Sequence, residues 1–200
     1  MKNKIFTPAI TLLAAALLIA VMPTEAEAAV YDDTVRLHIL ANSDSEEDQT
    51  LKYEIRDEVL EHFGKELSAL DSAKDAETAL KGVLDEIETF CERRVYERGY
   101  SYNVDVTLGK EWYDTREYEG FTLPKGIYTS LRIIIGDGEG KNWWCIMYPP
   151  LCLDAATETA PADDAVKKYT DEEFTLVTGG GYNVKFKMLE LISDAFSQKH

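Results

Sequence analysis

The chain has 200 residues, of which 45% are apolar and 29% are charged, so we expect one domain with a real hydrophobic core and exclude a disordered or fibrous protein. Lys and Arg together number 21 and Asp and Glu 37, which gives a formal net charge of −16. Nucleic acids and anionic lipid headgroups both attract basic surfaces, so we expect this chain to bind neither of them.

The first segment has the pattern of a secretory signal. Two lysines among the first four residues precede an apolar run at Ile10–Met22, and Ala26 and Ala28 have the spacing of small residues that a signal peptidase accepts. We expect residues 1–28 to be a signal peptide that directs export, with cleavage near Ala28–Ala29. The apolar run is short for a bilayer-spanning helix, and an uncleaved anchor is the alternative.

Export would allow the three cysteines to oxidise. Pro149 and Pro150 bend the chain between Cys145 and Cys152, which favours a disulfide between these two, worth roughly 2.5 kcal/mol in the chain-entropy model. Cys91 falls in a helical apolar stripe and is expected to be a buried, unreactive thiol. The other pairings and a chain without any bridge stay open. With no Cys-x-x-Cys pair and only three histidines, no structural zinc site is expected.

The first half of the chain predicts one strand and two helices. Residues 35–40 alternate in polarity and predict a strand. Ser45, with Asp48 three residues later, is typical of a helix start, and that helix is expected to end at Gly64. A longer helix is predicted over Ser72–Arg98, and Gly82 inside it is expected to mark a close contact with the sheet.

The second half predicts three strands, at Tyr102–Leu108, Ile127–Ile135 and Asn142–Tyr148. The last of them is apolar on both faces, with Trp143 on one side and Trp144 on the other. Such a strand is either central and covered on both sides, or covered on one side and open to a partner on the other.

The end of the chain is acidic and then amphipathic. Residues 155–181 predict an exposed acidic linker with a short helix around Asp164–Thr170, and residues 182–200 predict a helix that packs on the domain. With residues 29–154 as the globular domain, the order strand, two helices, three strands and C-terminal helix predicts an α+β (mixed α/β) two-layer sandwich.

No catalytic set emerges from the sequence. The loop Gly136–Gly140 lacks the Lys-Ser/Thr pair and the following helix of a phosphate-binding loop. Cys145, His38 and Asp44 would make a cysteine-type hydrolase only if the fold brought them together around an accessible thiol. A cell-wall-binding module with exposed aromatic side chains is another alternative. We expect a protein that is not an enzyme and holds no metal or cofactor.

Arg36 and His38 share one face of the first strand, where they are expected to form a polar cluster with Asn42 or Asp44. That cluster is either a structural network or a recognition patch. Tryptophan side chains are favoured anchors of protein interfaces. The candidate interface residues are therefore Arg36, His38, Asn42, Asp44, Trp143 and Trp144, with a purely structural role as the alternative for each.

Two blocks of sequence resemble the stage II sporulation protein R family, over about residues 30–154. The first block is Arg36-Leu-His-Ile-Leu-Ala-Asn-Ser-Asp44, followed by Gln49, Leu51, Lys52, Arg56 and Asp57. The second comprises Leu123-Pro-Lys-Gly126-Ile-Tyr128, Leu131-Arg132, Ile135-Gly136, Gly138, Gly140, Asn142-Trp-Trp-Cys145 and Pro149-Pro-Leu-Cys152. Lys125, Thr129-Ser130 and Asp137 depart from the pattern, and residues 154–181 match none of it.

The resemblance implies an exported signalling protein of endospore formation. Such a protein is made in the forespore and acts in the intermembrane space between forespore and mother cell. There it activates a membrane-embedded aspartic protease at its extracytoplasmic face, and the protease removes the pro-sequence of an early mother-cell sigma factor. On this interpretation the chain acts by contact with the protease and has no proteolytic activity of its own.

Overall fold

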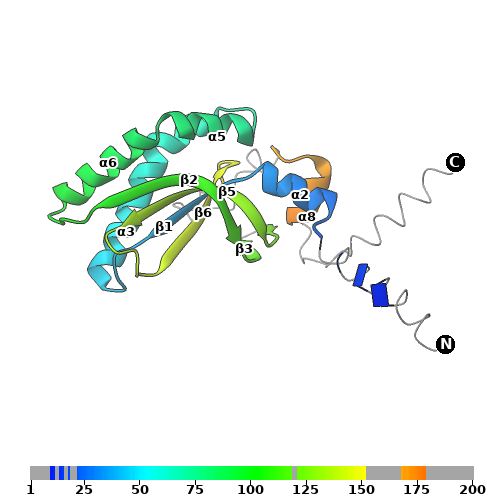
Figure 1. The fold of residues 1–200 in the computed structure, drawn as a ribbon. Coiled ribbons are helices and arrows are strands. Elements are labelled where there is room, and N and C mark those ends of the chain that lie inside the picture. Colours follow the sequence, from blue (N-terminus) through cyan, green and yellow to red (C-terminus); the bar gives the residue numbers. More distant parts are fainter. Residues whose placement is uncertain are drawn as a thin grey trace.

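The structure is a computed structural model that describes residues 10–11, 14–15, 18, 22–118, 121–151 and 168–178. A layer of helices packs on one face of a four-stranded sheet, and a short hairpin and two short helices lie at one end of that sheet (Figure 1). The predicted α+β architecture with two layers is confirmed. The elements are α2 (Glu25–Asp32), β1 (Val35–Leu40), α3 (Glu46–Val59), the π-helical turn η1 (Leu60–Gly64), α4 (Lys65–Ser68), α5 (Ala73–Gly82), α6 (Leu84–Glu97), β2 (Val104–Tyr113), β3 (Arg116–Tyr118), β4 (Phe121–Leu123), β5 (Gly126–Ile135), β6 (Asn142–Tyr148) and α8 (Asp171–Thr178).

The four-stranded sheet is mixed and has the strand order β2-β5-β1-β6. β1 runs parallel to β5 and antiparallel to β6, and β2 runs antiparallel to β5. A parallel pair needs a long crossover, and the helices together with β2 supply it. β1 therefore lies between two neighbours, and its first five residues are all buried.

The core lies between the sheet and the helices. α3 and α5 contact β1, and α6 contacts β2. Each large aliphatic side chain that leaves water here contributes roughly 1.5–3 kcal/mol. The fully buried residues of this layer include Leu37, Ile39, Ile55, Leu80, Ile87, Val95, Leu131 and Ile133.

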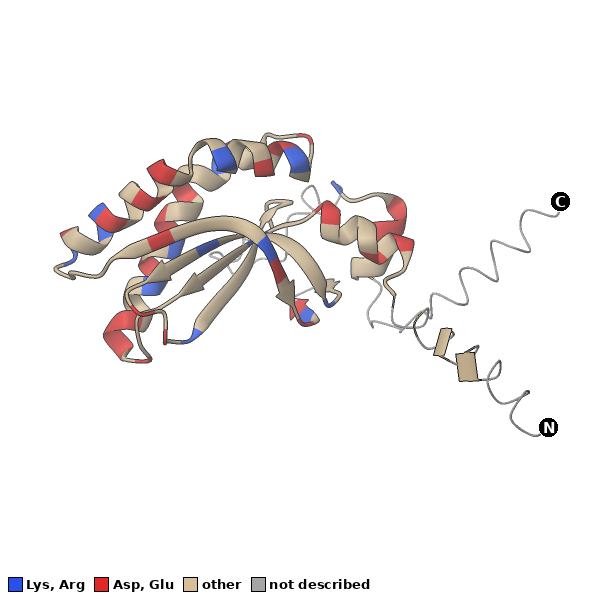
Figure 2. Ribbon diagram, in the orientation of Figure 1, with Lys and Arg blue, Asp and Glu red and all other residues tan. Residues whose placement is uncertain are grey.

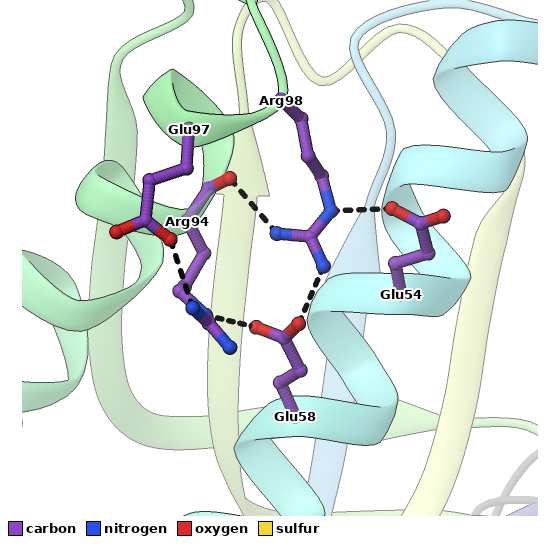
Figure 3. A network of polar contacts seen from close by, with 5 residues as sticks. All are labelled: Glu54, Glu58, Arg94, Glu97 and Arg98. Atoms are coloured by element: carbon purple, nitrogen blue, oxygen red, sulfur yellow. Dashed lines mark hydrogen bonds and ion pairs between the residues drawn. The ribbon is translucent and has the colours of Figure 1, made fainter.

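An ion-pair network joins α3 to α6 on the outer surface of the helix layer (Figure 3). Arg94 Nε donates to Glu58 Oε2 at 2.5 Å, and Arg98 donates to Glu54 and to the other oxygen of Glu58. Although burial opposes its ionisation, the hydrogen bonds from Arg94 and Arg98 lower the pKa of Glu58. The network fixes the pairing of the two helices, and salt should weaken it because it faces water.

The helices differ from the predicted ones in two respects. The first does not end at Gly64, because the chain continues through η1 into α4. The predicted single helix over Ser72–Arg98 is two helices, α5 and α6, separated at Val83. A Cβ placed on Gly82 would meet nothing within 4 Å, so the predicted close contact with the sheet is wrong. This glycine instead ends α5.

The strands at residues 35–40, 127–135 and 142–148 are confirmed, within one residue at their ends. The strand predicted to end at Leu108 runs on to Tyr113, and the hairpin β3–β4 that follows was not predicted. This hairpin has short strands and no clear alternation of apolar and polar residues, so period two could not reveal it.

Two short helices, α2 and α8, lie where the sequence predicted the end of a signal peptide and an acidic linker. α2 begins with a capping box between Thr24 and Glu27 and buries Val30 fully, so the predicted cleavage site at Ala28–Ala29 falls inside a helix. α8 lies in the predicted linker, but C-terminal to the helix expected at Asp164–Thr170.

The structure does not describe residues 152–167, residues 179–200 and most of the first 21. The rest of the linker, the helix at 182–200 and the signal peptide therefore stay predictions. Within the described part of the chain, no helix has both the length and the apolar character that crossing a bilayer requires.

Candidate functional site

The face of the sheet that points away from the helices carries several predicted polar candidates. Side chains alternate along a strand, so the register places them together. One end of this face is covered, because Tyr118 of the hairpin and Tyr31 of α2 pack over it. At the other end Thr107, Arg132 and Asn142 are exposed. We call this surface the open face; it consists of Asp105, Thr107, Glu111, Tyr113, Tyr128, Ser130, Arg132, Arg36, His38, Asn142 and Trp144.

His38 lies at the centre of the open face and is 7% exposed. Its Nδ1 is 2.8 Å from Glu111 Oε1 and its Nε2 is 2.8 Å from Asn142 Oδ1. Tyr113 donates to the other carboxylate oxygen of Glu111 and receives a hydrogen bond from Ser130. Since both ring nitrogens already have partners, His38 has no free nitrogen for a metal or for general-base catalysis.

Arg36 is fully buried, and no carboxylate of the described residues pairs with it. Its guanidinium carbon lies 3.8 Å from the centre of the Tyr113 ring and 5.1 Å from that of Tyr128, and Nη2 donates to the Tyr118 hydroxyl at 2.7 Å. Nε and Nη1 have no hydrogen-bond partner in the part of the chain that the structure describes. Burial raises the pKa of all three tyrosines, so their hydroxyls stay protonated and none neutralises the guanidinium. An unpaired buried charge of this kind destabilises a fold.

Trp144 and Arg116 form the accessible part of the site. The guanidinium carbon of Arg116, on β3, lies 4.0 Å from the centre of the Trp144 ring, and Trp144 also stacks on His38 with 5.5 Å between ring centres. Arg116 Nε is buried without a hydrogen-bond partner. Arg132 is exposed and pairs with His38 in the register of β5 and β1. Two arginines and a tryptophan therefore lie around His38.

Asn42 and Asp44 have different partners, in the loop before α3. The Asn42 amide donates to Asp48 at 2.9 Å and its Oδ1 accepts from the backbone N–H of Asp137 at 3.0 Å. Asp44 Oδ1 accepts from the backbone N–H of Lys141 at 2.7 Å. The predicted polar cluster of Arg36 and His38 with these two residues is therefore wrong. Asn42 and Asp44 instead hold the loop at 136–140 against the start of α3.

We call the contacts that Asn42, Asp44, Asp48 and Lys52 make around this loop the loop clamp. Two of these residues, Asp48 and Lys52, are buried charged groups. Burial opposes the ionisation of Asp48, but hydrogen bonds from Ser43 and Asn42 lower its pKa overall. Lys52 is 1% exposed and donates to Gln49 Oε1 at 2.6 Å and to the carbonyl of Lys141 at 2.9 Å, and burial lowers its pKa. The first block of the family resemblance thus includes residues that fasten a loop.

Replacing Gly140 by alanine should disrupt the loop clamp. The new Cβ would lie 2.2 Å from the backbone oxygen of Ser43, which cannot move away as a flexible side chain would. We expect a loss of about 1–3 kcal/mol in the free energy of unfolding, measured by urea denaturation. Gly109→Ala is the control, because nothing lies within 4 Å of a Cβ placed there. Equal stability of the two variants would contradict this account of the loop.

The two adjacent tryptophans lie on opposite faces of β6. Trp143 packs on the helix side, with its ring 5.5 Å from that of Tyr53 and the guanidinium carbon of Arg56 4.5 Å from its centre. Trp144 is on the open face. Of the two alternatives for this strand, the structure shows coverage of one face by α3 and partial coverage of the other by β3.

The cysteines do not form a catalytic site with His38. Cys145 is buried and disulfide-bonded, whereas Cys91 is free and its pKa is raised to about 12, mainly by burial. Cys152 lies outside the described residues, so its pairing with Cys145 stays a prediction. Cys145 pairs with Leu37 and His38 with Trp144, which places Cys145 and His38 on opposite faces of the sheet. The Cys145–His38–Asp44 hydrolase is therefore not assembled.

No group of three or more His, Cys, Asp or Glu residues suited to a metal ion occurs in the described ranges. Glu111, Tyr113 and Arg116 were not predicted as site residues, and Arg132 entered the sequence prediction only as part of the second family block. Glu111 and Tyr113 do continue the alternation of the strand beyond Leu108, which was the available signal. Nothing in the sequence indicated that Arg116 would lie over Trp144.

Comparison with known proteins agrees with the sequence resemblance. Residues 31–158 match the family described as stage II sporulation protein R. The chain is 34% identical over 185 residues to the stage II sporulation protein R of Bacillus subtilis (strain 168), an alignment that covers 83% of each chain. No solved structure matches. The chain belongs to the stage II sporulation protein R family.

Proposed function

We propose that this chain is an exported signalling protein of endospore formation that activates a membrane-embedded aspartic protease by contact. It would act in the space between forespore and mother cell and lead to the processing of an early mother-cell sigma-factor precursor. Membership of the family supports the sporulation role. The protease, the compartment and the absence of catalysis are what the sequence resemblance implies, and the open face is our candidate for the contact surface.

The accessible end of the open face carries this proposal. Trp144 is partly exposed, with Arg116 over its ring and Arg132 on the other side of His38, on a face that no described helix covers at that end. Tryptophan and arginine are the residue types most enriched among the anchors of protein interfaces. A rigid sheet also holds such side chains in a fixed arrangement, which reduces the entropy lost on docking.

The polar groups beside Trp144 support docking over catalysis. His38 is held on both ring nitrogens, and the nearest cysteine in the register, Cys145, points to the other side of the sheet. A nucleophile activated by a neighbouring base is the usual sign of a hydrolytic site. Here the two residues that would form such a site, Cys145 and His38, lie on opposite faces of the sheet.

The test is a reconstitution of the full chain with the protease and the sigma-factor precursor. Removing an interface anchor costs about 2 kcal/mol or more, so Trp144→Ala should lower activation at least tenfold while circular dichroism shows a folded protein. Trp112→Ala is the matched control, because Trp112 is 60% exposed and lies on the other face of the sheet. A folded Trp144→Ala variant with full activity would remove the open face from the proposal. No activation by the unaltered chain would refute the function itself.

A further inference from the structure

We infer that the open face binds an acidic segment of its protein partner, whose carboxylates pair with Arg116 and Arg132 beside Trp144. The inference rests on the proposed function and adds the chemistry of the partner surface to it. It begins from the distribution of ion pairs in a chain that has 37 acidic residues against 21 basic ones.

Three of the four arginines of the helix layer have acidic partners, and the exposed Arg93 has none among the described residues. Arg56 pairs with Asp57, Arg94 with Glu58 and Glu97, and Arg98 with Glu54 and Glu58. Acidic residues are plentiful on α2, α8 and the start of α3 (Figure 2). An arginine in this chain would therefore be expected to find a carboxylate.

On the open face, by contrast, every arginine lacks an acidic partner among the described residues. In residues 22–118, 121–151 and 168–178, no carboxylate lies within ion-pair distance of Arg36, Arg116 or Arg132. Arg36 and Arg116 each keep a buried N–H group without an acceptor. Buried donors without acceptors are rare in folded proteins, because each costs about 1–3 kcal/mol. Because the Nε of Arg116 is itself buried, an acceptor from outside the chain could reach only the partly exposed remainder of this residue.

The geometry prepares Arg116 to receive a carboxylate. Its guanidinium lies against the Trp144 ring, which limits its motion and leaves the planar edge of the group as the binding surface. A guanidinium held in this way can bind a carboxylate through two parallel hydrogen bonds. Trp144 would add apolar contact area to the same partner segment.

Arg132 supplies a second positive group across the sheet. Arg132, His38 and Trp144 are direct neighbours in the register of β5, β1 and β6. Strands are about 4.8 Å apart, so Arg132 and Trp144 are separated by roughly 10 Å. This separation suits carboxylates on one extended segment that crosses the strands over His38.

Two acidic residues share the face and limit where the segment can lie. Both carboxylate oxygens of Glu111 already have hydrogen-bond partners, His38 and Tyr113. Asp105 is exposed on β2, at the edge of the sheet remote from Trp144. The segment is therefore expected over β5, β1 and β6. The net charge of −16 excludes a long polyanion, which the rest of the molecule would repel, and favours a short acidic stretch of a protein.

The first experiment measures activation of the protease by the full chain at several ionic strengths. The double variant Arg116→Gln/Arg132→Gln should activate at least tenfold less well than the unaltered chain and should lose most of the salt dependence. Arg93→Gln is the matched control, because Arg93 is an exposed arginine on α6 that makes no ion pair within the described residues. Unchanged activation and unchanged salt dependence in the double variant would overturn the inference and leave the proposed function intact.

A second experiment needs no protease. A capped hexaglutamate peptide is titrated into the full chain while the arginine Nε–Hε resonances are followed by NMR, with hexaglutamine and hexalysine peptides as controls. Only hexaglutamate should shift the resonances of Arg116 and Arg132, and the double variant should show no binding at this face. Equal shifts with hexaglutamine, or shifts confined to other arginines, would overturn the inference even if activation by the chain is observed.

Discussion

The double variant Arg36→Met/Tyr118→Phe is expected to unfold at a higher urea concentration than the unaltered chain. Arg36 is a fully buried cation with no carboxylate among its described neighbours, and Tyr118 is its hydrogen-bond acceptor. Replacing a buried charge and its partner by apolar groups of similar size is often stabilising, by about 1–4 kcal/mol. Methionine is flexible enough to fill the space between the Tyr113 and Tyr128 rings.

The attraction of Arg36 to the two tyrosine rings opposes this gain. Each such contact is worth roughly 0.5–2 kcal/mol, with the higher values when the cation is desolvated. Arg36→Ala is the control, because it removes the charge but leaves a cavity and should lower the free energy of unfolding by about 2–4 kcal/mol. If the double variant is as unstable as Arg36→Ala, the guanidinium stabilises the fold and our account of its cost is wrong.

Raising the pH is expected to detach α8 from α2. The Asp33 carboxyl, at the end of α2, is hydrogen-bonded to Glu173, which is 1% exposed on α8. Glu173 Oε2 accepts from the backbone N–H and the hydroxyl of Thr170, whereas Oε1 has no donor among the described residues unless Asp33 keeps its proton. The contact between Asp33 and Glu173 therefore holds the helices together only while Asp33 is protonated.

The sign of the pH dependence follows from Asp33. Burial, repulsion by Glu173 and the shared hydrogen bond raise the pKa of Asp33 above its ordinary value. Docking is therefore fully stabilised below about pH 4, the pKa in the unfolded chain, and this contribution is lost as the pH rises through the higher folded-state pKa. The other charged or titratable groups near the pair are Asp32 and Glu27 on α2, Asp171 and Glu172 on α8, Tyr169 before α8, Tyr148 on β6 and Arg36 on β1.

The measurement is the ¹⁵N heteronuclear NOE of residues 171–178 in a pH series that starts near pH 4 and rises to pH 8. In the unaltered chain α8 should lose order with increasing pH. Glu173→Gln should keep α8 ordered throughout, since an amide can donate to Asp33 at any of these pH values. Glu172→Gln is the control and should behave as the unaltered chain, because Glu172 is exposed. An identical pH response in Glu173→Gln and the unaltered chain would contradict the shared proton.

The sequence predicted the elements whose periodicity is strong. The strand with Leu37 and Ile39 and the strand with Trp143 and Trp144 were placed correctly because their alternation is regular, and the family blocks were recognised from their motifs. The break after Gly82 was missed because an apolar stripe continues through it, although the glycine itself was noticed.

The candidate site was predictable in part. Arg36 and His38 do share a face of β1, as period two required. Their partners were not predictable. Glu111 and Tyr118 lie about 70 to 80 positions later in the sequence, and only the order of the strands brings them near Arg36 and His38. Asn42 and Asp44 were grouped with Arg36 and His38 because they are close in sequence. The loop at the end of β1 instead directs them to another part of the molecule.

If residues 1–28 are a signal peptide, as the sequence predicts, the position of α2 limits when it could be removed. A peptidase binds its substrate as an extended backbone, whereas Ala26, Ala28 and Ala29 lie within hydrogen-bonded helical turns that Thr24 caps and Val30 anchors. Hydrolysis after Ala28 would also separate Thr24 and Glu27, the two capping residues, from the rest of the chain. Cleavage at the predicted bond would therefore have to precede the formation of α2, and a chain that folded first would keep residues 1–28.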